Sequence, residues 1–508
     1  MNRLAAVPGL LMLMATSPLP AQAPPEGLIT LPEPSSPFVA FTVWVQVGSQ
    51  HDPEGKEGLA ALTVALLSDG STTADRYDAI LTKLYPMAAG YGASVDKEMT
   101  VFSGRVHRDN LEAYYTLFRH AVLQPAFSEE DFARIKARTL NFLERSRRFA
   151  RDEELSKELL SWMAYRGTPY AHPEEGYVAS VRGITLDDVR DFYRTHYLRS
   201  TVVVGVAGGY PEGFARRVRQ DFNALRAGSV PAVAAPQPRV PEGIKVLIVE
   251  KPTDATAISL GFPIGLVRGQ PDFWALMAAN AWFGEHRSSV SHLYQVIRES
   301  RGMNYGDYSY IEAFPLGYTT QQPPVNVARR SHLFEIWIRP IARTGPDDLH
   351  DRALFATRAA WRELDRLVRN GLTDGQVSEI KQYLRNFSVT YGSTVSRRLA
   401  YAVDDAFYGL SGGGYLAGIR PGIEGLTTDA VNAAVRRHFQ AGNMYVVFIT
   451  QDAEGLKRKL LSGEPTAIRY AGEKPTSLLA EDAEIARFPI PVTADDITIM
   501  GINEVFER

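Results

Sequence analysis

The sequence predicts an α+β protein built from two homologous domains of similar size. Its 508 residues exceed one small module, and 45% hydrophobic with 22% charged residues excludes disordered, collagen-like and coiled-coil chains. The main observation is a long internal repeat. Gly183 to Val189 aligns with Gly425 to Val431 at an offset of 242 residues, and the same offset joins Glu212 to Glu454.

Each copy of the repeat predicts a helix followed by a buried, β-branched strand. Thr185 and Thr427 are expected to cap the two helices, because a threonine hydroxyl accepts hydrogen bonds from first-turn N–H groups. Further helices are expected to begin at Ser128 and at Thr373, where Gln376 completes a capping box.

Each half also opens with a strand-like segment followed by an apolar helix. The expected strands are 41–47 and 258–264, and the expected helices are 59–67 and 273–283. A stretch with four prolines separates the halves and is typical of an extended, semi-rigid linker. The expected organisation is a signal peptide (1–23), an N-terminal domain (30–225), a linker (226–244), a C-terminal domain (245–470) and a tail (471–508).

The first residues resemble a secretory signal. Arg3 precedes an apolar run from Leu4 to Ala15, and Ala21-Gln22-Ala23 has the small-x-small form of a cleavage site. The run is shorter than the roughly 20 apolar residues that span a bilayer. We therefore expect an exported protein, periplasmic or extracellular, with no membrane span after signal removal.

The residue inventory excludes several kinds of site. A net charge of −3 gives no general attraction for nucleic acid, and the absence of cysteine excludes disulfides and thiolate zinc sites. The grouping of histidines that comes closest to a metal-binding motif is Glu285-His286 with His292, and we interpret it as a polar turn between helices. Gly409-Leu410-Ser411-Gly412-Gly413 matches a serine-hydrolase elbow in letters, but it follows a predicted helix, so we interpret it as a flexible turn and Ser411 as a weak nucleophile candidate.

The segment from Val43 to Ser71 resembles the opening of the insulinase, pitrilysin and mitochondrial-processing-peptidase family of zinc peptidases, the inverzincins. The resemblance covers nearly the whole mature chain. It implies that each domain is a mainly antiparallel sheet with helices packed on it, and that the two domains form half of a clamshell. In the family, the first helix carries the zinc motif His-x-x-Glu-His.

This chain departs from that motif. Ala61, Val64 and Ala65 occupy the positions of the two histidines and the glutamate, and none of them can bind zinc or abstract a proton. Glu144 is a candidate remnant of the third ligand, with a solvated surface charge as the alternative. Gly92 stands where the family has an edge-strand asparagine. We therefore expect no metal in this chain.

Arg298 and Tyr305 match a family segment in which an arginine and a tyrosine lie seven residues apart. The resemblance implies that both donate hydrogen bonds to substrate and to the developing oxyanion, across the cavity from the zinc. The structural alternative is that Arg298 complements a helix dipole and Tyr305 is an ordinary strand aromatic. Arg301 competes with Arg298 for the same role. A strand is expected at 303–311, after a left-handed cap at Gly302.

The resemblance therefore implies a non-catalytic subunit of a heterodimeric zinc metallopeptidase. A homologous partner subunit would hold the zinc, and this chain would supply Arg298 and Tyr305 to the shared active site, where peptides are cleaved. The alternative is a purely structural or peptide-binding member without a role in catalysis, like the non-peptidase core subunits of respiratory complexes that resemble this family.

Overall fold

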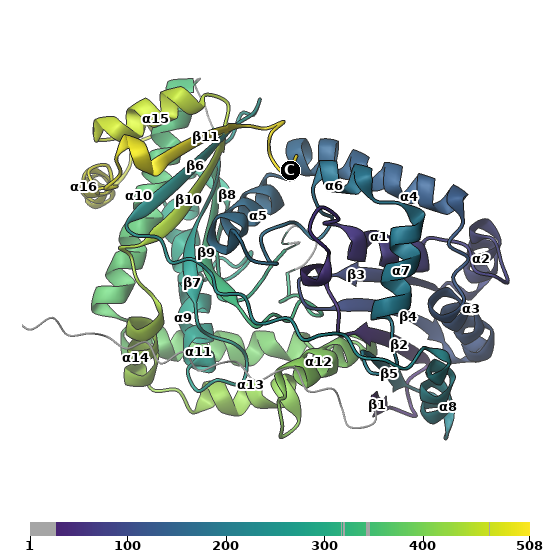
Figure 1. The fold of residues 1–508 in the computed structure, drawn as a ribbon. Coiled ribbons are helices and arrows are strands. Elements are labelled where there is room, and N and C mark those ends of the chain that lie inside the picture. The colour runs from purple at the N-terminus through teal and green to yellow at the C-terminus, as the bar shows by residue number, and fades with distance from the viewer. Residues whose placement is uncertain (1–26, 316, 318–320, 342–345, 467) are drawn as a thin grey trace, which may run out of the picture.

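The computed structural model describes residues 27–508 except 316, 318–320, 342–345 and 467 (Figure 1). The predicted signal peptide lies outside the described residues. The chain forms two halves, each with one mixed, mainly antiparallel sheet and several helices, which confirms the predicted α+β fold class. None of the helices in the described part is long and apolar enough to cross a bilayer.

The first half contains a five-stranded sheet in the order β1-β5-β2-β4-β3. Its strands are β1 (Leu28–Pro32), β2 (Phe38–Val45), β3 (Gly90–Val95), β4 (Thr100–His107) and β5 (Val202–Gly208). Its helices are α1 (Leu59–Ser68), α2 (Tyr77–Leu84), α3 (Leu111–Leu123), α4 (Glu129–Asn141), the π-helix η4 (Phe142–Ala150), α5 (Asp152–Tyr165), α6 (Val178–Gly183), α7 (Leu186–His196) and α8 (Phe214–Asp221).

The second half contains a six-stranded sheet in the order β11-β6-β10-β7-β9-β8. Its strands are β6 (Ile244–Glu250), β7 (Ala257–Ile264), β8 (Asn304–Tyr310), β9 (His332–Pro340), β10 (Met444–Thr450) and β11 (Ile497–Gly501). Its helices are α9 (Phe273–Gly284), the π-helix η6 (Tyr294–Glu299), α10 (Pro346–Asn370), α11 (Asp374–Phe387), α12 (Val395–Tyr408), α13 (Gly414–Glu424), α14 (Thr428–His438), α15 (Ala453–Ser462) and α16 (Thr476–Ile485).

Local sequence signals account for most of these boundaries. The hydroxyls of Ser128, Thr185, Thr373 and Thr427 each accept a hydrogen bond from a first-turn backbone N–H, as predicted. Between the halves, residues 227–241 form no helix or strand. Strand β6 already begins at Ile244, so the extended segment is slightly shorter than the predicted linker.

The two sheets follow the same strand order, and β11 is the one addition. It comes from the C-terminal tail and pairs in parallel with β6. The tail then continues to the first half, where Phe506 and Glu507 carbonyls accept hydrogen bonds from Val178 and Ala179. In Figure 1 the C-terminus accordingly lies between the halves, close to α6. The tail therefore ties the second sheet to the first half.

The halves also exchange helices. Helix α5 of the first half packs on the second sheet, where Leu155 and Leu159 join one buried cluster with Val447. Helix α12 of the second half packs on the first sheet, where Leu399 shares a cluster with Trp44. Figure 1 shows α12 next to β2 and β5, and α5 next to the second sheet. Helix α12 begins at residue 395 and α5 at residue 152, so the two exchanged helices occupy nearly equivalent positions in the two copies of the 242-residue repeat.

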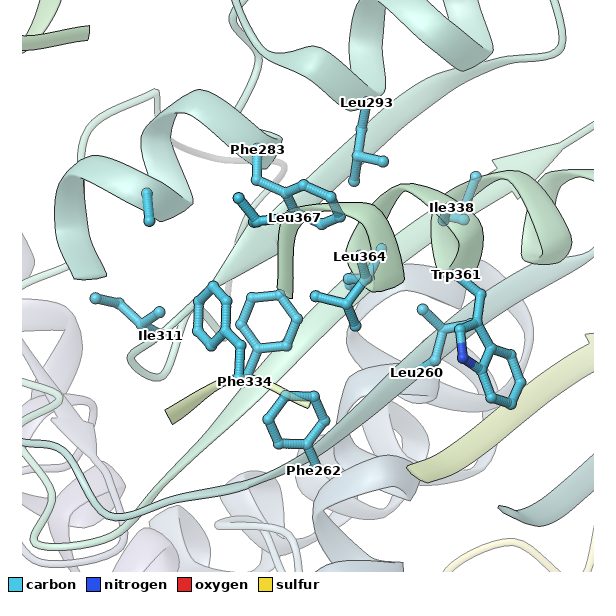
Figure 2. Close-up of a cluster of buried hydrophobic side chains, with 14 of the residues drawn as sticks. Leu260, Phe262, Phe283, Leu293, Ile311, Phe334, Ile338, Trp361, Leu364 and Leu367 are labelled. Carbon is cyan, nitrogen blue, oxygen red and sulfur yellow. The ribbon is translucent and has the colours of Figure 1, made fainter. Parts of the chain in front are cut away.

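The largest apolar cluster lies between the second sheet and its helices. Leu364 and Leu367 of α10 lie close to Phe334 of β9, with Leu260 of β7 beside Trp361 (Figure 2). Burial of large side chains is worth about 1.5–3 kcal/mol each. The cluster includes Leu293, Ile297 and Met303, so it fixes the segment before β8 against the rest of the half.

Candidate functional site

Helix α1 carries the three positions of the altered zinc motif. It begins after Gly58, whose φ of 98° is left-handed, and the Asp52 carboxylate accepts hydrogen bonds of 2.7 Å from the N–H groups of Gly58 and Ala60. Val64 is buried, and Ala61 and Ala65 are partly buried. Methyl and isopropyl groups offer no lone pair, so this surface of α1 has no ligand for a metal ion.

Glu144, the candidate remnant of a third ligand, lies in η4. Its carboxylate forms an ion pair of 2.5 Å with Arg182, and 34% of its side chain is exposed. An exposed carboxylate with an arginine partner has the environment of an ordinary surface charge. Within the described part of the chain, no three His, Asp or Glu side chains are grouped so that they could hold a metal ion.

Gly92 lies in β3, which is the edge strand of the first sheet. Its backbone pairs with Ser103 of β4, and an added Cβ would meet no atom within 4 Å. A larger side chain would therefore fit at this position without steric conflict. Gly92 therefore lies on an edge strand, as the resemblance implies.

Arg298 and Tyr305 lie on either side of one turn. Arg298 is in η6, and its guanidinium lies over the Tyr294 ring at 4.7 Å from the centroid. The chain then turns at Gly302, whose φ of 59° gives the predicted left-handed cap, and enters β8, which contains Tyr305. For Tyr305 the description covers the backbone alone. The helix before the turn is a π-helix, which sequence periodicity does not predict.

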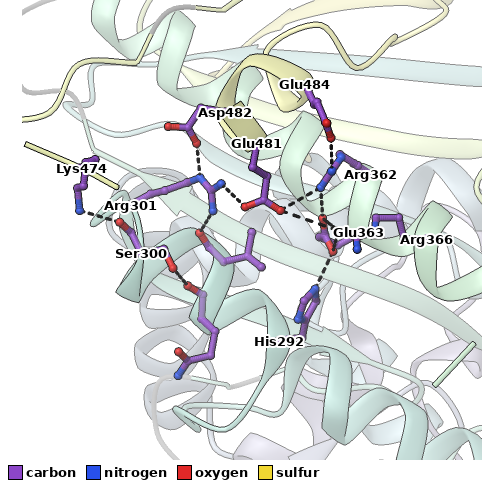
Figure 3. A network of polar contacts seen from close by, with 12 residues as sticks. His292, Ser300, Arg301, Arg362, Glu363, Arg366, Lys474, Glu481, Asp482 and Glu484 are labelled. Carbon is purple, nitrogen blue, oxygen red and sulfur yellow. Dashed lines mark hydrogen bonds and ion pairs between the residues drawn. The ribbon is translucent and has the colours of Figure 1, made fainter. Parts of the chain in front are cut away.

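Arg301 has a different environment from Arg298. Only 1% of its side chain is exposed, and its guanidinium donates to Asp482 and Glu481 of α16 and to the Val296 carbonyl, each at 2.7 Å (Figure 3). These charge-assisted contacts use three of its nitrogen atoms. Arg301 is therefore a structural arginine, and it does not compete with Arg298 for a substrate.

The tail helix α16 braces the segment that carries Arg298. Besides its contacts with Arg301, Glu481 accepts from Arg362 of α10 at 3.2 Å, and the Lys474 ammonium donates to the Ser300 carbonyl at 2.7 Å. Figure 3 shows these residues converging from the turn after η6, from α10 and from the tail around α16. The sequence signal was the acidic run Glu481-Asp482 in the tail, but its partners lie far away in the chain.

The Glu285, His286 and His292 cluster does not form a common site. His292 contacts Glu363 at 2.7 Å, whereas the buried His286 contacts the Tyr310 hydroxyl at 2.9 Å. Ser411 is exposed in the turn that follows α12, so no strand precedes it and the geometry of a nucleophile elbow is absent. Both interpretations as turns agree with the structure.

A buried ionic network closes the contact between the halves. Arg329 and Arg330, which precede β9, pair with Asp96 and Glu98, which follow β3. Lys97, with a fully buried side chain, contacts Glu158 at 3.0 Å and Glu174 at 3.1 Å. Such pairs are costly to bury and are disrupted when one partner is removed, so they hold the two halves in one relative position.

The network also shifts the pKa of its carboxyl groups. Burial alone would raise the pKa of Glu174, but the charges of Lys97 and Arg329 outweigh it and lower the pKa to about 2. For Glu158 the balance is reversed, and burial raises its pKa above the ordinary range. Glu174 therefore stays ionised and supplies a negative charge that pairs with Lys97 and Arg329.

Two family models match this chain. Residues 28–176 match the model described as insulinase (peptidase family M16), and residues 183–384 match the model described as the peptidase M16 inactive domain. An uncharacterized zinc protease of Streptomyces coelicolor is 26% identical over 368 residues, which is 71% of this chain and 74% of that protein.

Two further similarities are more distant. A probable mitochondrial-processing peptidase subunit beta of Arabidopsis thaliana is 21% identical over 251 residues, 49% of this chain and 46% of that protein. The crystal structure of a peptidase M16 inactive domain from Pseudomonas fluorescens has a TM-score of 0.71 and 24% identity, and covers 84% of this chain and 95% of that chain. At this identity the structural likeness supports the fold alone.

Proposed function

This chain belongs to the insulinase family of peptidases (family M16), and we propose that it is the non-catalytic subunit of a heterodimeric zinc metallopeptidase. The observation that carries the proposal is the combination of Ala61, Val64 and Ala65 at the zinc-motif positions with Arg298 and Tyr305 in the second half. A chain that has lost its metal ligands gains nothing by itself from two substrate-binding donors. It can use them at an active site that another chain completes.

The proposed partner is a homologous subunit with an intact His-x-x-Glu-His motif and its own zinc. The zinc would polarise the scissile carbonyl and activate water in the partner. Arg298 and Tyr305 would donate hydrogen bonds to the peptide and to the oxyanion that forms during attack. A single oxyanion donor in a water-poor site is worth about 3 kcal/mol.

Two properties of the described residues support this role. Arg298 is held over Tyr294 at 4.7 Å but, unlike Arg301, is only partly buried. The neighbouring backbone is fixed by the tail, through the contact of Lys474 with Ser300 and that of Glu481 with Arg301. A donor that is rigid but reachable meets the requirement of a preorganised site. The protein would act outside the cytoplasm after removal of residues 1–23.

The test begins with purification of the chain from its native source, followed by metal analysis of each co-purifying polypeptide. We expect zinc in a partner with the His-x-x-Glu-His motif, and no peptide hydrolysis by this chain alone. In the reconstituted pair, Arg298→Ala or Tyr305→Phe is expected to lower kcat by about 100-fold, whereas assembly measured by gel filtration is unchanged. Chelator-sensitive hydrolysis by the isolated chain would refute the proposal.

The alternative is a structural or peptide-binding subunit. Under this alternative the chain still binds a partner or a peptide, but Arg298→Ala and Tyr305→Phe leave turnover of the complex unchanged. The matched control is Arg194→Ala, an exposed arginine of α7 whose ion-pair partner among the described residues is Asp191. The control separates loss of a specific donor from a general loss of positive charge.

A further inference from the structure

The helical segment that carries Arg298 is held at both of its ends. It comprises residues 292–299 and includes η6, and we call it the Arg298 helix. Beyond its C-terminal end, the tail contacts Ser300 and Arg301. At its N-terminal end, His292 contacts α10, and Figure 3 shows both ends within one polar network.

His292 contacts both α9 and α10. Its Nε2 lies 2.7 Å from the Glu363 carboxylate of α10, and its ring stacks on Trp282 of α9, with 4.4 Å between the ring centroids and 13° between the ring planes. The side chain of His292 is 26% exposed, whereas that of Glu363 is 2% exposed. These contacts fix both the position and the plane of the imidazole ring.

Glu363 joins the two ends of the network. Besides His292, it accepts hydrogen bonds from Arg362 at 2.7 Å and from Arg366 at 3.3 Å, and Arg362 also donates to Glu481 of the tail at 3.2 Å. Burial raises the pKa of Glu363, but the hydrogen bond from His292 and the neighbouring charges outweigh burial and hold the pKa below its ordinary value. Because an ionised carboxylate only accepts, the His292 Nε2–H donates a charge-assisted hydrogen bond.

Apolar packing holds the Arg298 helix in a different way. Leu293 and Ile297 are buried in the main cluster of the second half, and they keep one face of the helix against it. Hydrophobic burial is non-directional, so it opposes lifting of the helix more strongly than rotation or sliding. Hydrogen bonds are directional, and those at the two ends oppose rotation and sliding as well.

We propose that His292 is a positioning residue for Arg298, which it holds in place through the N-terminal end of the Arg298 helix. Tyr294, over which the Arg298 guanidinium lies at 4.7 Å, comes two residues after His292 in the same helix. A shift of the N-terminal end therefore displaces the tyrosine ring and the guanidinium together. This inference rests on the proposed function of Arg298, since misplacing a reacting group by about 1 Å can cost about 100-fold in rate. His292 acts through Arg298 and is not itself a catalytic residue.

A double-mutant cycle in the reconstituted pair tests this role. His292→Ala is expected to lower kcat by about tenfold. His292→Gln keeps an N–H donor near the position of Nε2 and is expected to stay within about twofold of wild type. In an Arg298→Ala background, His292→Ala is expected to lower kcat no further, because the residue that it positions is absent. The matched control is His107→Ala, which removes an exposed histidine with a carboxylate partner, Asp109 at 3.3 Å, and should leave kcat unchanged.

Amide hydrogen exchange of the isolated chain measures the same contact without a partner or zinc. His292→Ala is expected to accelerate exchange at residues 292–299, and His292→Gln is expected to exchange like wild type. The inference is overturned if His292→Ala lowers kcat by the same factor in both backgrounds, or if it leaves kcat unchanged where Arg298→Ala lowers it. If Arg298→Ala itself leaves kcat unchanged, the proposed function fails. In that case accelerated exchange in His292→Ala still supports its hold on the helix, and unchanged exchange overturns it.

Discussion

Arg301→Met tests whether the tail helix braces the segment that carries Arg298. Methionine keeps much of the side-chain volume but removes the guanidinium that contacts Asp482, Glu481 and the Val296 carbonyl at 2.7 Å. The side chain of Asp482 is 10% exposed and that of Glu481 is 31% exposed. The variant therefore leaves one nearly buried carboxylate short of its cation, and a second that water can solvate.

The magnitude follows from these exposures. Breaking a fully buried ion pair costs about 3–5 kcal/mol, whereas an exposed pair is worth about 0–1 kcal/mol. With one partner in each class, we expect Arg301→Met to lower the free energy of unfolding by about 2–4 kcal/mol. The control is Arg298→Met, which removes a partly exposed cation over Tyr294, and for which we expect a loss of about 1 kcal/mol or less.

Urea unfolding and amide hydrogen exchange of the isolated chain measure both effects. Arg301→Met is expected to accelerate exchange in residues 294–303 and in α16 together, because each loses its anchor to the other. Arg298→Met is expected to leave α16 protected. If Arg301→Met unfolds at the wild-type urea concentration and exchanges like wild type, then the ion pairs of Arg301 do not hold this segment, and the brace is wrong.

Three further predictions concern packing and charge. A Cβ at Gly205 would lie 2.9 Å from Leu399 Cδ1 of the exchanged helix α12, so Gly205→Ala should cost about 1–3 kcal/mol in urea unfolding, and less in a Leu399→Ala background. Glu285 has a pKa raised from 4.5 to about 7, so its stability contribution is present below pH 4.5 and is lost as pH rises through 7. In urea unfolding, the free energy of unfolding of Glu285→Gln should therefore exceed that of wild type by up to about 3 kcal/mol at pH 9 and by little at pH 5. An equal difference at the two pH values would refute the assignment. The pKa of Glu174 is lowered from 4.5 to about 2, so Glu174 contributes stability above pH 4.5 that is lost as pH falls towards 2. In Glu174→Gln the urea midpoint of unfolding should therefore fall less steeply with decreasing pH than in wild type.

Local signals in the sequence were sufficient to predict many of the helices and strands, but not which elements pack against one another. Thr185 and Thr373 cap their helices because a cap depends on residues three positions away. The altered zinc motif was equally visible, since Ala61, Val64 and Ala65 lie within one helix. Contacts within a few residues are encoded by spacing, and these were predicted.

Long-range contacts were not encoded in this way. Arg301 and Arg298 look alike in the sequence, and their difference depends on Glu481 and Asp482, which are 180 and 181 residues from Arg301. The apolar face of α5 likewise predicts burial but does not specify against which sheet. The tail had no periodic signal strong enough to predict a strand at Ile497–Gly501.

The exchange of α5 and α12 changes how the internal repeat should be understood. A repeat of two domains suggests two units that fold and move independently, but here each sheet is covered by a helix that the other half supplies. The ionic network around Lys97 and Arg329 adds buried charges that only the closed arrangement satisfies. Separating the halves would therefore expose two apolar sheet faces and leave buried charges without partners, and both changes are unfavourable. The chain consequently behaves as one unit, and Arg298 keeps a fixed position relative to the first half as well as to its own sheet.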